Sequence, residues 1–148
     1  MTIRKRVLTS DDITAYNYDA CKKVVISKFA KYKQYLQSKE EYEETLSTSS
    51  KVYSDVKLNC SGYRNDVEKI NIRIEELCLK MKDLDDLIAD NIDSLDEYEK
   101  IIFDGMILHY LTNENMEEKL NKKKDFVVRY KKSCYIKVSK WFHEEVYR

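Results

Sequence analysis

The sequence predicts an all-α protein in which a long helical hairpin or coiled coil is followed by a C-terminal helix-turn-helix. Three features of its 148 residues support this fold class: it has no proline, it has only two glycines, and 36% of its residues are charged. Sandwiches and barrels need many of the tight turns that proline and glycine mark. A chain with so few of them favours long helices joined by polar connectors.

The N-terminal part of the chain predicts a short arm and then a long helix. We expect residues 1–11 to form the arm, and Ser10 or Asp11 to cap a helix from about 12 to about 46. Apolar residues along this helix recur every three or four positions, as one face of a helix requires. They are Cys21, Val25, Phe29, Tyr32 and Leu36.

A Ser/Thr-rich segment then divides the helical region 12–92. Residues 45–65 contain Gly62 and a run of serines and threonines. Such composition is typical of a connector, so we expect a loop here. The two flanking helices could fold back on each other across this loop.

The second helix carries the clearest periodic pattern in the chain. Its apolar residues alternate spacings of three and four over about four heptads with acidic flanks, which predicts a coiled-coil seam. The partner of this seam is either the preceding helix or a second copy of the chain, so the sequence allows both a hairpin and a homodimer. Asn91 continues the frame and would fix the register there. The seam, with these residues as candidate dimer contacts, consists of Val67, Ile70, Ile74, Leu77, Met81, Leu84 and Ile88.

Residues 95–148 are predicted to form the helix-turn-helix module. Residues 91–96 would be a hinge, with Ser94 and Glu97 forming a capping box at the start of a third helix, about Leu95 to Leu111. Thr112 would cap the next helix.

The turn and the last helix complete this module. The short helix would run from about Asn113 to Leu120, and Asn121 would adopt the left-handed conformation after it. The last helix would begin near Asp125. The expected core of the module is Leu111, Met116, Leu120, Val127 and Cys134, and the inward stripe of the last helix continues through Tyr130, Val138 and Trp141.

Charge is unevenly distributed along a chain whose formal net charge is zero. Residues 66–104 hold 13 acidic and 5 basic residues, whereas residues 119–140 hold 9 basic residues and one acid. A basic last helix favours contact with a polyanion such as DNA, although two solvated faces of opposite sign would give the same counts.

The exposed face of the last helix supplies candidate DNA contacts. Arg129 is the candidate for reading a base edge, because arginine to guanine is the commonest specific contact. Lysines would neutralise phosphates, with Lys137 as a further phosphate contact. The candidate DNA-binding residues are Lys122, Lys123, Lys124, Val128, Arg129 and Lys132.

The segment LTNENMEEKLNKKKDFVVRYKKSCYIKV resembles region 4 of sigma factors, and within that superfamily the ArpU/RinA-like phage late-transcription regulators. The resemblance implies a DNA-binding transcriptional regulator of phage type, with double-stranded DNA as its partner and RNA polymerase as a second candidate partner. The family commonly has an apolar residue where Gly105 lies. The residues that match its motif are Leu111, Thr112, Met116, Glu118, Leu120, Asn121, Val127, Arg129, Tyr130, Cys134 and Val138.

Other classes of function find little support in the sequence. It has no glycine-rich phosphate loop and no G-x-S-x-G motif, and its four cysteines stand apart. We expect the acidic run Asp83, Asp85 and Asp86 to be a solvated helix face rather than a metal site. The sequence thus predicts no catalytic residue, no metal and no cofactor.

The expected location is the cytoplasm of a bacterial host, because the N-terminus lacks the apolar core of a secretory signal and no window is apolar enough to span a membrane. The rival interpretation is a helical protein-interaction module. In that case a degenerate helix-turn-helix would bind or inhibit a host protein, and salt-dependent DNA binding would distinguish the two.

Overall fold

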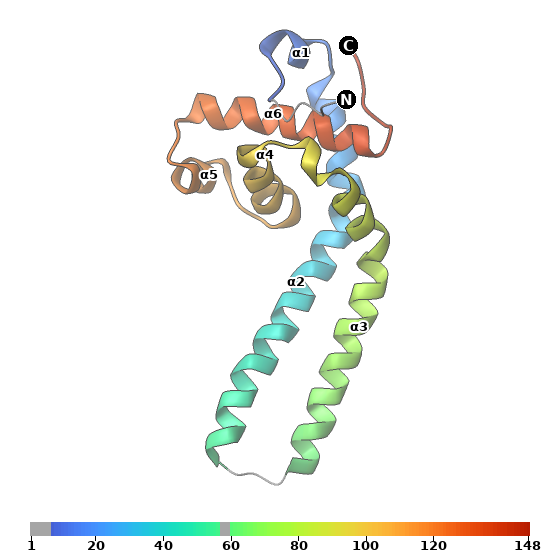
Figure 1. Cartoon of the computed structure of the whole chain (residues 1–148), viewed down its shortest axis with the longest axis vertical. Coiled ribbons are helices and arrows are strands. Elements are labelled where there is room, and N and C mark those ends of the chain that lie inside the picture. Colours follow the sequence, from blue (N-terminus) through green and yellow to red (C-terminus); the bar gives the residue numbers. More distant parts are fainter. Residues whose placement is uncertain (1–6, 57–59) are drawn as a thin grey trace.

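The computed structural model describes residues 7–56 and 60–148, with side chains described for residues 7–47 and 66–148. Its described residues form helices and no strand, which confirms the predicted all-helical class. A long antiparallel hairpin extends from a head in which α6 is surrounded by shorter helices (Figure 1). The elements are α1 (Ser10–Thr14), α2 (Tyr18–Val56), α3 (Cys60–Asn91), the 3-10 turn η1 (Ile92–Ser94), α4 (Glu97–Ile102), the π-helical turn η2 (Phe103–Leu108), α5 (Asn113–Leu120) and α6 (Lys124–Trp141).

The predicted first helix is interrupted near its start. Thr9 caps α1 in a capping box with Asp12, so the expected cap at Ser10 or Asp11 was wrong, and both residues lie within α1. The rest of the expected arm, residues 1–6, lies outside the described residues. Tyr16 separates α1 from α2 because it pairs with Tyr147 in an isolated antiparallel β-bridge.

The two long helices follow the predicted periodicity. Every residue of the seam is buried or half-buried, and Met81 is the most enclosed. Of the other residues from 66 to 91, all except Leu87 and Asn91 are exposed. Helices α2 and α3 run side by side in the same chain (Figure 1), and Met81, Leu84 and Ile88 of the seam share one core with Phe29, Tyr32 and Leu36 of the α2 stripe. Asn91 is the last residue of α3, and its amide donates to the carbonyl oxygen of Leu87 in its own helix at 2.8 Å. It therefore lies at the end of the seam.

The predicted loop at 45–65 was wrong for residues 45–56 and 60–65, which are helical, and residues 57–59 lie outside the described residues. Helix α2 continues to Val56, and α3 begins at Cys60. Serine and threonine cost a helix only about 0.5 kcal/mol each relative to alanine. No proline or glycine occurs before Gly62 to stop the first helix.

The third helix begins later and ends earlier than predicted. Asp96 is its N-cap and Glu99 completes the capping box, so the expected cap at Ser94 was wrong. Regular α-helix ends at Ile102 and continues as the π-helical η2 rather than running to Leu111. Asp96 has the advantage of a carboxylate at the positive end of the helix dipole.

Gly105 lies in η2 against α5. A Cβ atom built on this glycine would lie 2.5 Å from the Met116 methyl carbon and 2.9 Å from Cδ1 of Leu111. The missing side chain therefore lets Met116 pack directly against the backbone of η2. This contact gives a physical reason for glycine where the resembling family has an apolar residue.

The predicted bounds of α5 are confirmed, and α6 begins at Lys124, one residue before the expected Asp125. Thr112 caps α5 in a capping box with Asn115, and Asn121 has φ 53° and ψ 47°, in the left-handed region. Most of the expected core is buried, including Met116 and Val127. Leu111 is the exception, because it remains 36% exposed beside η2.

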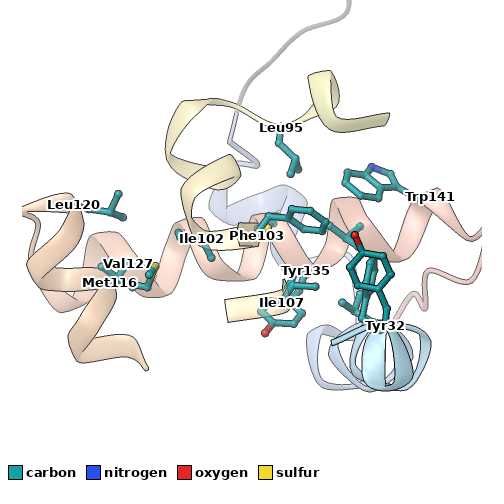
Figure 2. Packing of buried hydrophobic residues seen from close by; sticks show 14 of the residues in the cluster. Tyr32, Leu95, Ile102, Phe103, Ile107, Met116, Leu120, Val127, Tyr135 and Trp141 are labelled. Carbon is teal, nitrogen blue, oxygen red and sulfur yellow. The ribbon is translucent and has the colours of Figure 1, made fainter. Parts of the chain in front are cut away.

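Helix α6 is the centre of the head. Every residue from Ser133 to Ser139 is buried, and α2 and α4 are the elements that pack most closely on α6. Phe103, Trp141 and Tyr135 fill the space between these elements (Figure 2). Only the first half of α6 therefore has a free face.

Candidate nucleic-acid interface

The six candidate DNA-binding residues lie at one end of the head but do not form a single surface. Lys122 and Lys123 belong to the turn before α6, and Lys124 is its first residue; all three are exposed. Arg129 is exposed about one turn further along. Val128 and Lys132 are half-buried.

The turn lysine Lys122 faces an aromatic cluster. Its Nζ lies 5.2 Å from the centroid of the Phe126 ring and 5.8 Å from that of Tyr98. Tyr130 stacks on Phe126 with 4.2 Å between ring centroids. Tyr130 is half-buried and not part of the fully buried core. Lys122 is thus held by cation–π contacts on one side of α6.

Lys132 lies on a different side of the same helix. Its Nζ is 5.6 Å from the centroid of the Tyr18 ring. Together with Val128 and Arg129 it lines a cavity of about 290 Å³ whose opposite wall is formed by α1, including Ile13. Asp125 also borders this cavity. Helix α1 therefore flanks the predicted reading face and narrows the approach to it.

Two further residues join this cationic region. Lys131 donates from Nζ to Oδ1 of Asn113, the first residue of α5, at 3.3 Å. Burial, and then the ammonium of Lys22 beside it, lower the pKa of Lys131. Lys22 comes from α2, so three helices meet here. The sequence pattern did not identify Lys22, because it lies more than a hundred positions from Lys131 and its own helix is not basic overall.

Lys137 was wrongly expected to contact phosphate. It is buried, and its Nζ lies 2.6 Å from Oε1 of Glu99 and 3.3 Å from the carbonyl oxygen of Ser94. The other carboxylate oxygen of Glu99 accepts from the Ser133 hydroxyl at 2.7 Å. This polar network connects α6 to α4 and η1 inside the head, so Lys137 is not available to a ligand.

The thiol of Cys134 and the carboxylate of Asp85 both have partners within the fold. Burial, together with the nearby Glu99 carboxylate, raises the pKa of the Cys134 thiol well above its usual value, so this thiol is a poor nucleophile. Asp85 of the acidic run accepts a hydrogen bond from the Tyr32 hydroxyl. Among the residues that the structure describes, no three histidine, cysteine or acidic side chains cluster as metal ligands would.

Comparison with protein-family models, curated proteins and solved structures gave no match for this chain. The likeness to sigma region 4 therefore rests on the motif residues alone. Within the described parts of the chain, no helix combines the length and the apolar character needed to cross a bilayer.

Proposed function

We propose that this protein is a DNA-binding transcriptional regulator that contacts duplex DNA with the turn before α6 and the first half of that helix. The observation that carries the proposal is the close approach of the Lys22 and Lys131 side chains next to Asn113. Lys131 lies in the half of α6 that also bears Arg129 and Lys132. Adjacent ammonium groups repel each other, and an anion between them removes that cost. A nucleic-acid backbone supplies such anions at regular intervals.

The exposed position of Arg129 fits the same proposal. Arg129 is exposed and precedes the buried stretch of α6 that begins at Ser133. It lies about one turn into the helix, where recognition helices place the residues that contact bases. Lys122, Lys123 and Lys124 are exposed at the start of the helix and suit phosphate contacts.

Fluorescence anisotropy with labelled duplexes tests this function. We expect the full chain to bind duplex DNA at low salt, with an affinity that falls linearly on a log–log plot as salt rises. The duplexes should include the region upstream of its own coding sequence beside a scrambled control. No binding at 50 mM salt, by a protein shown to be folded, would rule the proposal out.

A second candidate function, the protein-interaction module, is favoured by the outer face of the hairpin. Ile72 and Leu79 on α3 are 54% and 74% exposed, and their spacing of seven places them on one helix face. A partner helix that covered both side chains would remove this apolar surface from water. Loss of binding to a host protein in a Leu79→Asp variant, without any DNA affinity in the wild type, would favour this candidate.

A further inference from the structure

A separate cavity lies on the head, between α2 and η2. Its volume is about 250 Å³, and most of its walls are apolar or aromatic. Ile107 and Tyr135, which lie beside each other in Figure 2, form its inner side. Val25, Phe29 and Ala30 of α2 form the facing side.

Lys33 is the only charged residue that lines this cavity. Its Nζ lies 3.4 Å from the carbonyl oxygen of Met106 and 4.0 Å from the centroid of the Tyr110 ring. In the described part of the chain no carboxylate lies within 4.0 Å of this ammonium. Burial also lowers the pKa of Lys33. A half-buried cation with only neutral partners favours an incoming anion.

The mouth of the cavity is apolar as well. Ile26 is 53% exposed and Tyr110 is 60% exposed, so both keep much of their hydrocarbon surface in water. One wall is the π-helical turn η2, and such turns occur frequently at functional sites. An apolar pocket with one convergent charged group has the general composition of a small-molecule site.

We propose that this cavity binds a small carboxylic acid with an apolar body, such as a medium-chain fatty acid, whose carboxylate pairs with Lys33. The hydrocarbon part would lie between Phe29 and Ile107 and cover the exposed side chain of Ile26. A single negative charge matches the single lysine better than a doubly charged phosphate would. The cavity volume of about 250 Å³ lies just below the roughly 300–1,000 Å³ of usual ligand pockets, so a short chain fits better than a long one.

Titration of octanoate into the full chain tests this site, with 1-octanol as the neutral ligand of the same length. Calorimetry measures both affinities, and backbone amide shifts in nuclear magnetic resonance spectra locate the ligand. We expect octanoate to bind about tenfold or more tightly than octanol, because a charge-assisted hydrogen bond to Lys33 contributes to only one of them. The shifted amides should belong to residues 25–34 and to η2.

Substitutions in α2 distinguish binding in the cavity from nonspecific hydrophobic binding elsewhere on the protein. In Lys33→Met the affinity for octanoate should fall to about that for octanol, and the affinity for octanol should not change. Lys31→Met, an exposed lysine outside the cavity, should change neither affinity. Ala30→Phe should fill the space and abolish binding of both ligands.

Three results would overturn the proposal. The first is equal affinity for the two ligands, and the second is an equal effect of Lys31→Met and Lys33→Met. The third is octanoate binding that saturates only above about 10 mM, which corresponds to less than about 3 kcal/mol of binding free energy. These outcomes do not decide the proposed DNA binding, because its test measures salt-dependent affinity for a duplex and Lys33 is not among the residues proposed to contact DNA.

Discussion

Lys137 reaches Glu99 across the interior of the head, with 2.6 Å between Nζ and Oε1, and both side chains are buried. The two residues belong to α6 and α4. The carboxylate also completes the capping box of α4, through the backbone N–H of Asp96 at 3.1 Å. One acidic side chain therefore begins a helix and joins it to the central one.

Breaking this buried pair should be costly. Lys137→Met leaves the Glu99 carboxylate buried without its cation, and we expect the free energy of unfolding to fall by about 3–5 kcal/mol. Urea denaturation followed by circular dichroism measures this. The control is Lys100→Met, whose pair with Asp93 is largely exposed and should contribute about 0–1 kcal/mol. Equal effects of the two substitutions would mean that water reaches Glu99.

Leu120 and Leu111 form a matched pair of leucines at the two ends of α5. Leu120 is 8% exposed in the main core, so Leu120→Ala should cost about 2–5 kcal/mol of unfolding free energy. Leu111 is 36% exposed, so Leu111→Ala should cost clearly less. Thermal and urea denaturation of both variants checks this, and the reverse order would mean that α5 packs differently.

The seam allows a test of self-association. Met81, Leu84 and Ile88 pack in the core of the same chain, so a second copy would share the distal part of the seam, Val67 to Leu77. If it does, light scattering at micromolar concentration will show a dimer, and Leu77→Asp should disrupt it because the charge would lie in a half-buried apolar seam. Leu79→Asp, on the exposed face, should leave the mass unchanged.

A monomeric wild type would show instead that packing within one chain, which the structure shows for Met81, Leu84 and Ile88, extends along the whole seam. Leu77→Asp should then lower the stability of the hairpin, measured as helical content against temperature, while Leu79→Asp does not.

The contacts of His109 predict that stability depends on pH. Its Nδ1 lies 2.7 Å from the carbonyl oxygen of Asp104, and its Nε2 lies 2.8 Å from Oε1 of Glu40. Two acceptors suit a doubly protonated ring. Burial lowers the pKa of His109, but these acceptors outweigh it and raise the pKa above the usual 6.5.

The pKa of His109 is higher in the folded state than in the unfolded state. Its contribution to the free energy of unfolding should therefore be complete below about pH 6.5 and be lost as pH rises through the folded-state pKa. Urea midpoints measured from pH 5.5 to 8.5 should show a decline that His109→Gln removes. The magnitude should be modest, since the imidazole is 37% exposed and screened by water. An identical pH profile in the variant would contradict the assignment.

The basic residues of α6 should differ in how they affect DNA binding. Arg129→Ala should cost about 1–3 kcal/mol on the preferred site and little on other sequences, as expected for a base contact. Lys132→Ala should weaken all sequences alike and reduce the salt slope by about one. Lys82→Ala, an exposed lysine on α3, is the control that should change neither.

Local patterns predicted the parts of the fold that depend on neighbouring residues. The three-and-four spacing identified the facing stripes of α2 and α3, and Thr112 and Asn121 marked the two ends of α5. Asp96 was missed as a cap because Ser94 and Glu97 fit the same motif two positions earlier. The structure places Ser94 at the end of η1, where its hydroxyl accepts from the Trp141 indole N–H at 3.1 Å, and the helix begins two residues later after Asp96.

Long-range juxtapositions could not be predicted in this way. The pairing of Lys137 with Glu99 changes a lysine from a candidate phosphate contact into part of the interior. The approach of Lys22 to Lys131 and the enclosure of Lys33 both depend on how α2 crosses the head. A helical wheel of any single segment contains none of this information.

The contact between the two ends of the described chain bears on how the protein folds during synthesis. Tyr16 pairs with Tyr147, the N–H of Asn17 donates to the carbonyl oxygen of Val146 at 2.8 Å, and the N–H of Arg148 donates to that of Ala15 at 3.1 Å. A growing chain could form the α2–α3 hairpin while the ribosome is still translating α6, because its contacts lie within the first two thirds of the sequence. The break between α1 and α2 would reach its final geometry only after residues 146–148 have emerged. Until then the apolar side chains of α2 that the head covers would stay exposed to solvent, where chaperones bind such surfaces.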